Sequence, residues 1–166
     1  MVGAAHDTSM KLRKFTPSDA PRVAALVGDY EVSRWTSNIP HPYVIHDASA
    51  WIEFTESDAT RHPYAVEVAE EVVACVSYWP HEAGGTEVGY WVGKEHWGKG
   101  IATDALKMLL AIESFPNTER IVAKVMDGNF GSARVLEKCG FSLVESCDIQ
   151  CRGMDAPSSI FVRAGK

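Results

Sequence analysis

The sequence predicts an α/β fold in which the strands of a layered sheet alternate with helices. Two patterns predict it: in some short stretches apolar residues alternate with polar ones, as in strands, and in others they recur every three or four positions, as in helices. The chain has 166 residues, 46% of them apolar and 23% charged, so one domain with a sizeable core is expected. We place it at residues 10–166, after a disordered lead at residues 1–9, which are small and polar without a period.

The first half of the chain predicts a strand, two helices and a hairpin. A strand at 12–15 precedes a helix over 16–28, which opens with Thr, Pro, Ser and Asp residues typical of a helix start. Asp47 can cap a second helix, which continues through Phe54. Two stretches with the strand pattern, 64–68 and 72–76, flank a short acidic turn and indicate a hairpin.

The second half of the chain alternates strands with helices. A pair of glycines at 84 and 85 precedes the first of these strands, and Pro116 ends the first helix. We expect strands over 87–92, 121–125, 143–149 and 160–163, and helices over 101–112 and 132–139.

Charge and cysteine content argue against several classes of protein. Lys and Arg total 16 against 22 Asp and Glu, a net charge of -6, which disfavours nucleic-acid binding. The apolar stretches are too short and interrupted for a signal peptide or a membrane span. The four cysteines form no CxxC pair, so no metal is expected and the thiols are expected to be reduced. We therefore expect a cytoplasmic protein with neither nucleic-acid nor membrane partners.

Gly98 and Gly100 lie between a predicted strand and a predicted helix. Such a junction can bind phosphate, because glycine lets the backbone approach a ligand and helix N-terminal amides attract anions. A tight connection without a ligand is the simpler alternative. Two nucleotide motifs nearly match: Gly100 stands where a Walker A loop needs Ser or Thr, and Thr103 stands where the dinucleotide motif needs Gly or Ala. Both departures weaken the alternative of a nucleotide-binding phosphotransferase.

Two longer motifs carry a family resemblance. WGKGIATDAL at 97–106 and NFGSARVLEKCGF at 129–141 resemble the two coenzyme-binding motifs of the GNAT N-acetyltransferase superfamily. The resemblance spans 11–164, and LRKFTPSDA, the Pro-His-Pro segment at 40–42 and EVGYWV make it similar to the ribosomal-protein-alanine N-acetyltransferase-like group. It implies a mixed, mostly antiparallel sheet of about six to seven strands with helices on both faces. It also implies direct transfer of an acetyl group from acetyl-CoA to an amine.

The resemblance implies where acetyl-CoA binds. The pyrophosphate is expected at the glycine turn and the first turn of the next helix, and the pantetheine along the backbone of the preceding strand. Trp97 stands where the family usually has Gln or Arg, which removes one polar contact. Asn129 can cap its helix, bond the pantetheine, or do both. The residues expected around acetyl-CoA are Trp91, Val92, Gly93, Trp97, Gly98, Lys99, Gly100, Ile101, Ala102, Thr103 and Asn129.

Ser132 is the first candidate catalytic residue. It resembles the residue that, in this group, protonates the departing CoA thiolate or holds the water that does so. Leu136 stands where many family members have a tyrosine, so the common phenol acid is expected to be absent. The alternative for Ser132 is a local hydrogen bond within its helix.

Glu87 is the second candidate catalytic residue, as the base that deprotonates the acceptor amine directly or through water. It begins the strand that leads to the glycine turn, and it shares a face of that strand with Gly89 and Trp91. An exposed charge at a strand end is the alternative. Glu145, Asp148 and bulk solvent are reserve bases.

The sequence leaves the acceptor as either a protein N-terminal amine or a small-molecule amine, and it leaves a homodimer open. A non-catalytic acyl-CoA-binding sensor is the alternative function. Trp35, Tyr43 and Trp51 either line the mouth of the acceptor site or pack between helix and sheet. Four histidines in separate turns are expected to be polar surface residues: His41, His46, His81 and His96.

Overall fold

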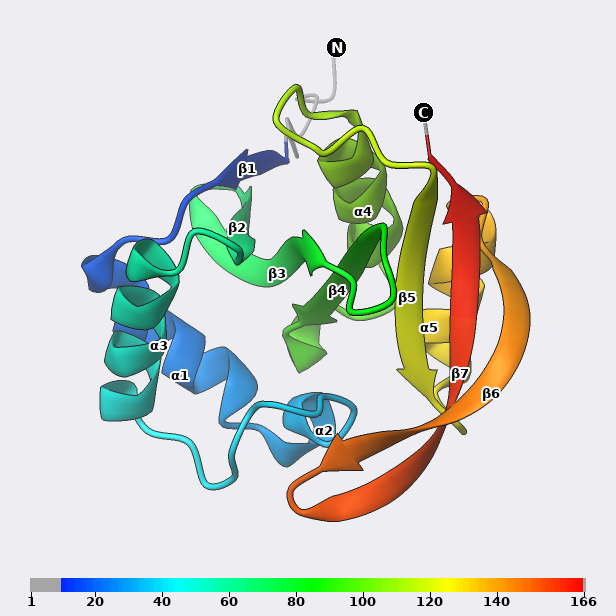
Figure 1. Ribbon diagram of the computed structural model, residues 1–166. Coiled ribbons are helices and arrows are strands. Elements are labelled where there is room, and N and C mark those ends of the chain that lie inside the picture. The colour runs from blue at the N-terminus through cyan, green and yellow to red at the C-terminus, as the bar shows by residue number, and fades with distance from the viewer. Residues whose placement is uncertain (1–9, 166) are drawn as a thin grey trace, which may run out of the picture.

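The computed structural model describes residues 10–165, which form a seven-stranded sheet with helices on both faces (Figure 1). The strand order is β1-β2-β3-β4-β5-β7-β6, and every neighbouring pair is antiparallel except β4 and β5. The predicted mixed, mostly antiparallel sheet is therefore confirmed. The lead expected at residues 1–9 lies outside the described residues.

The strands lie where the alternating pattern predicts them, and most are longer than the pattern. They are β1 (Lys11–Arg13), β2 (His62–Val68), β3 (Glu71–Pro80), β4 (Thr86–Val92), β5 (Arg120–Met126), β6 (Ser142–Cys151) and β7 (Met154–Ala164). The helices are α1 (Ala20–Val27), α2 (Tyr30–Ser33), α3 (Ile45–Ser57), α4 (Ile101–Ala111) and α5 (Phe130–Lys138). Within residues 10–165, no helix combines the length and the apolar character needed to cross a membrane.

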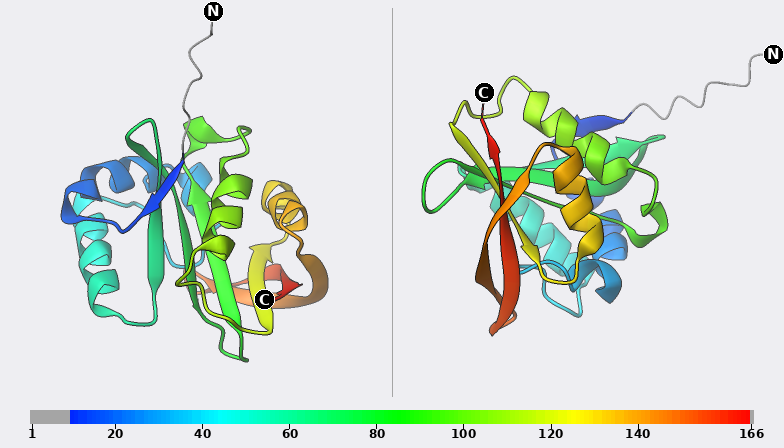
Figure 2. Two further views of the ribbon diagram at one scale, coloured as in Figure 1. Left: turned by 90° about the horizontal axis from the view of Figure 1, so that it is seen from above. Right: turned by 90° about the vertical axis from the view of Figure 1, so that its right-hand side faces the viewer.

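The sheet separates two apolar cores, because successive strand residues point to opposite faces. Ala65 and Cys75 pack with α1 and α3, whereas Val66 and Val76 pack with α4 and α5. Figure 2 shows the two helix pairs on the two sides of the sheet. The resemblance implied helices on both faces, and the structure confirms it.

Two features of the α2–α3 region differ from the sequence prediction. Helix α3 begins at Ile45, so Asp47 is its third residue rather than its cap. The carboxylate of Asp47 accepts a hydrogen bond from Val44 N at 2.8 Å and so satisfies an amide of the helix start from inside the first turn. Helix α2 was not predicted, because four residues are too few to show a helical period.

Strands β4 and β5 pair over only a short length and then diverge. The parallel ladder joins Thr86 to Ile121 and Glu87 to Val122. Beyond Glu87 the two strands separate, as Figure 1 shows at the centre of the sheet. The separation leaves the rest of β4 without a partner on that side.

Candidate active site

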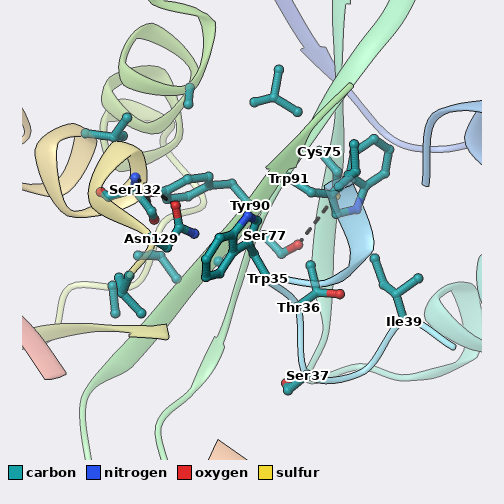
Figure 3. Close-up of a pocket in the computed structure, with 18 of the residues that line it drawn as sticks. Trp35, Thr36, Ser37, Ile39, Cys75, Ser77, Tyr90, Trp91, Asn129 and Ser132 are labelled. Carbon is teal, nitrogen blue, oxygen red and sulfur yellow. Dashed lines mark hydrogen bonds between the residues drawn. The ribbon is translucent and has the colours of Figure 1, made fainter. Parts of the chain in front are cut away.

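A cavity of about 1340 Å³ lies where β4 and β5 diverge, and it is lined from both faces of the sheet. Trp35 and Trp91 line it on the α1–α3 side, and Tyr90 and Ser132 line it on the α5 side (Figure 3). Nearly all of the predicted site residues line the cavity. The exceptions are Gly93 and Lys99.

The backbone of β4 is open toward the diverging β5. Gly93 N donates to Val73 O of β3 at 2.9 Å, and because backbone groups alternate along a strand, those of Trp91 also point to β3. Strand β3 therefore occupies the backbone groups of Trp91 and Gly93, and of the three residues expected along the pantetheine only Val92 directs its backbone at the gap. The amide of Val88 closes the last rung of the β4–β5 ladder, so the residues whose N–H and C=O both face the gap are Tyr90 and Val92.

The glycine turn adopts the backbone that its sequence requires. Gly98 and Gly100 have φ values of 74° and 75°, which side-chain-bearing residues rarely adopt, and the space where a Cβ would stand is open at both. The first backbone bond into α4 runs from Asp104 N to Gly100 O at 3.0 Å. Three amides before it therefore have no partner within the helix. They belong to Ile101, Ala102 and Thr103.

Trp97 makes a contact that no sequence pattern indicated. Its indole Nε1 donates to Val92 O at 2.8 Å, while 43% of the residue stays exposed. The bond ties the glycine turn to the end of β4 and occupies one carbonyl of the open edge. Exposed Arg134 and Lys138, four residues apart on α5, add positive charge to the cavity wall.

Tyr90 and Ser132 form a pair at the start of α5. Asn129 caps this helix by accepting from Ser132 N at 3.3 Å, which confirms its predicted capping role. The phenol of Tyr90 donates to Ser132 O at 3.1 Å and lies 2.5 Å from Ser132 Oγ. Figure 3 shows the Tyr90 ring directed at Ser132. Burial raises the pKa of Tyr90 to about 12, so the phenol is neutral at physiological pH.

The site contains a phenol, but at another position than the one that is common in the family. Leu136 is fully buried against α4 and the sheet, so its side chain belongs to the core. Tyr90 supplies a phenol from β4 instead, 42 residues before Ser132 in the chain. Alternation in EVGYWV places Tyr90 on the opposite face from Trp91, but no sequence signal links it to Ser132.

Glu87 is paired rather than exposed. Its Oε1 lies 2.8 Å from His81 Nδ1, and the two side chains are 12% and 5% exposed. Since a carboxylate only accepts hydrogen bonds, His81 Nδ1–H is the donor when Glu87 is ionised. The alternatives of an exposed strand-end charge for Glu87 and a surface position for His81 are therefore wrong. The reserve bases Glu145 and Asp148 are exposed on β6 and do not line the cavity.

Aromatic side chains form the wall on the α1–α3 side. Trp35, Tyr43 and Trp51 line the cavity, and Trp51 also packs edge-on against Phe15 at 5.0 Å. Both expected roles, cavity lining and packing, are thus present for Trp51. Trp79 joins this wall because Gly89, its diagonal neighbour on β4, has no side chain; a Cβ on Gly89 would lie 2.7 Å from the indole.

The described residues contain no group of three or more His, Cys, Asp or Glu side chains that could hold a metal ion. The four cysteines are free thiols. Burial raises the pKa of the Cys75 thiol to about 12, so this cavity-lining thiol stays protonated. The polar side chains that line the cavity include Tyr90, Ser132 and Glu87.

Comparisons with known proteins agree with this geometry. The family model described as an acetyltransferase (GNAT) domain matches residues 9–142. The chain is 30% identical to the uncharacterized N-acetyltransferase p20 of Bacillus licheniformis over 144 residues, which is 80% of this chain and 78% of that protein.

Solved structures show the same fold. RimJ of Mycobacterium smegmatis, in complex with CoA-disulfide, superposes with a TM-score of 0.82 at 20% identity, covering 93% of this chain and 81% of RimJ. The microcin C7 self-immunity acetyltransferase MccE, in complex with acetyl-CoA and AMP, gives 0.79 at 19% identity, covering 93% and 92% of the two chains.

Proposed function

The chain belongs to the GNAT acetyltransferase family, and on that premise we propose that it transfers an acetyl group from acetyl-CoA directly to a primary amine. The acceptor is a protein N-terminal amine or a small-molecule amine. The observation that carries the proposal is the unpartnered edge of β4, which leads from the glycine turn to the Tyr90–Ser132 pair. The complexes of RimJ with CoA-disulfide and of MccE with acetyl-CoA support the choice of co-substrate.

The residues present fit acetyl-CoA, which when bound supplies an activated acetyl thioester. The free amides of Ile101, Ala102 and Thr103 would hold the pyrophosphate, because a helix N-terminus presents N–H groups and a positive dipole to an anion. The open space in front of Gly98 and Gly100 leaves room for that contact. Lys99, which is exposed beside the turn, adds a positive charge.

The open edge of β4 would bind the amide groups of the pantetheine and polarise the thioester. Tyr90 offers an N–H group that faces the gap between the strands. An N–H fixed by a sheet needs no reorganisation to stabilise negative charge that develops on the thioester oxygen. Removing one such donor in other enzymes lowers kcat by about 10²–10³.

Ser132 would serve the leaving thiolate from the α5 side. The Tyr90 phenol has one proton, so the Ser132 O–H is free to donate into the cavity only when that proton goes to Ser132 Oγ rather than to Ser132 O. A phenol is a stronger acid than an alcohol, which favours the phenol as the donor of the shorter, 2.5 Å bond. The raised pKa of Tyr90 makes the phenol a poor net proton source. Ser132 therefore bonds the thiolate, or the water that protonates it, while Tyr90 fixes the orientation of the hydroxyl.

Glu87 would accept the amine proton from the α1–α3 side. Its side chain shares a strand face with Gly89 and Trp91, which is opposite to the face of Tyr90. The acceptor and the leaving group thus approach from opposite faces of the sheet and meet at the gap. His81 Nδ1–H donates to the carboxylate and orients it.

A panel of N-terminal peptides and small amines, incubated with acetyl-CoA, tests the proposal by thiol release and by the mass of the product. Acetylated amine together with stoichiometric CoA is the expected result. Tight acetyl-CoA binding without any thiol release would favour the sensor, and displacement of acetyl-CoA by ATP with magnesium would favour the phosphotransferase.

Because acetyl-CoA is made inside cells and the four thiols are free, we place the reaction in the cytoplasm.

A further inference from the structure

The hairpin of β6 and β7 extends past the sheet to α2, as Figure 1 shows below the centre of the molecule. Its ladder ends with Cys151 paired to Met154, so the turn is the two residues Arg152 and Gly153. Both have positive φ, 51° and 81°, as the tight hairpin turn demands. Arginine is uncommon in this backbone conformation. The contacts of the Arg152 side chain with a distant part of the chain explain why an arginine stands in this turn.

The guanidinium of Arg152 binds the segment that follows α2, more than 110 residues earlier in the chain. Nη2 donates to Ser33 O at 2.8 Å and to Ile39 O at 2.7 Å, and Nη1 lies 3.5 Å from Thr36 O. The same group lies 5.9 Å from the centre of the Tyr30 ring. One side chain therefore gathers three carbonyls of residues 33–39.

The segment has little other backbone support. Thr36 N donates to Ser33 O at 2.9 Å, which closes one turn. Within residues 10–165, no amide from 37 to 43 donates to a backbone carbonyl. A segment without its own backbone ladder depends on side chains for a fixed position. Arg152 supplies that support at both ends of the segment.

The segment carries part of the cavity wall. Trp35, Thr36 and Ile39 all line the cavity. The Cη2 atom of Trp35 is 3.7 Å from the position that a Cβ on Gly128 would take, so the indole reaches across to the residues just before α5. Figure 3 shows this indole inside the cavity. The position of residues 33–39 therefore determines the position of the cavity wall on the side where the acceptor is proposed to bind.

We propose that Arg152 is a positioning residue that holds residues 33–39, and Trp35 with them, against the acceptor side of the cavity. It acts on acceptor binding rather than on acetyl-CoA, because the glycine turn and the β4 edge are built by other elements. A lysine cannot replace it: an ammonium is a point donor, whereas the planar guanidinium fork reaches several carbonyls at once. The kinetic part of this inference rests on the proposed function.

Arg152→Lys tests the proposal, with Arg163→Lys as its matched control. Arg163 on β7 makes the same kind of contact, Nη1 to Cys139 O at 2.9 Å, but at the end of α5 and outside the cavity lining. We expect Arg152→Lys to raise KM for the acceptor by roughly tenfold, the effect of losing a charged hydrogen bond, and to leave KM for acetyl-CoA within about twofold. Arg163→Lys should leave both constants unchanged.

Acrylamide quenching of tryptophan fluorescence tests the same contact without any activity. Quenching measured with and without Trp35→Phe isolates the signal of Trp35. We expect Arg152→Lys to make Trp35 more accessible to the quencher, and Arg163→Lys to leave it unchanged.

The outcomes of these experiments separate the positioning role of Arg152 from the proposed acetyl transfer. Unchanged Trp35 quenching in Arg152→Lys, with its melting temperature preserved, overturns the positioning role. So does an equal rise of both KM values, because that marks a general loss of structure. If the wild-type protein transfers acetyl to no amine, the proposed function fails, and the quenching experiment still decides the role of Arg152.

Discussion

The phenol oxygen of Tyr90 lies 2.5 Å from the hydroxyl oxygen of Ser132, although the two residues belong to β4 and α5. The same phenol donates to Ser132 O at 3.1 Å, so it contacts both polar groups of the serine that face it. This pair brings a strand of the open edge and the helix beside it into one hydrogen-bonded unit. The family resemblance indicated Ser132 as a candidate catalytic residue, and this contact fixes where its hydroxyl lies in the cavity.

Tyr90→Phe should lower kcat roughly three- to tenfold, the effect of one lost hydrogen bond, because the Ser132 hydroxyl loses the partner that orients it. KM for acetyl-CoA should change little, since the backbone of residue 90 is kept. Initial rates of thiol release, measured at saturating acceptor and varied acetyl-CoA, give both kcat and KM for acetyl-CoA. Ser132→Ala should lower kcat at least as much, and the double variant should be no worse than Ser132→Ala, because the two residues act as one unit. Additive losses would contradict the pair.

The phenol pKa sets a further expectation for the same pair. Burial raises the pKa of Tyr90 to about 12, so the O–H donor is present at every pH below that value. Wild-type kcat should therefore show no falling limb due to Tyr90 up to about pH 10. A falling limb near pH 9 that disappears in Tyr90→Phe would show that the phenol ionises in the working range.

Gly100→Val should weaken acetyl-CoA binding by at least tenfold, because a β-branched residue at φ 75° strains the turn that presents the amides of α4. Gly84→Val is the matched control: Gly84 also has a positive φ, 96°, with open space around it, but lies in the β3–β4 turn. Isothermal titration calorimetry gives both affinities, and circular dichroism reports folding. Equal affinity of a folded Gly100→Val variant would remove the turn from the binding site.

Glu87→Gln should lower kcat/KM most at low pH, where the amine is protonated and needs a base, and a rise in pH should partly rescue the variant. His81→Asn should cause a smaller loss with the same pH trend, because it removes the hydrogen bond that orients Glu87. Glu145→Gln, an exposed carboxylate on β6, is the control and should match wild type. If only Glu145→Gln alters the low-pH limb, Glu145 is the base.

Asp19→Asn should destabilise the protein at neutral pH and lose this effect in acid. Arg13 bonds Asp19 at 2.8 Å and, with the amide of Thr16, lowers the pKa of the carboxyl. A lowered folded-state pKa stabilises the fold above the unfolded value of about 3.9 and stops doing so as the pH falls through the folded value. Urea unfolding at pH 7 and between pH 4 and 2 should show the two proteins converging.

Glu82→Gln is the control for that experiment. Lys124 also lowers the pKa of Glu82, but the Glu82 side chain is 78% exposed, where solvent screens the pair. Its unfolding free energy should follow wild type at each pH. An Asp19→Asn deficit that persists unchanged at pH 2 would show that the contact contributes through packing and not through charge.

The sequence alone determined the features that depend on neighbouring residues. A period of two or of 3.6 needs only local apolar spacing, which is why β2, β5, α4 and α5 were predicted close to their bounds. The glycine turn was also predicted, because a strand followed by glycines and a helix start is a local signal. Asn129 could be identified as a cap because capping spans only three residues.

The tertiary structure decided everything that depends on strand register and on the divergence of β4 from β5. Register decides that Trp91 and Gly93 bond to β3 while Tyr90 faces the gap. The turn between β3 and β4 decides that Glu87 meets His81, and the hairpin length decides that Arg152 reaches Ser33. These contacts join residues whose separations follow no period, and a shift of one residue would turn each side chain to the other face. Local spacing carries no record of such contacts, because the packing of the whole sheet selects them.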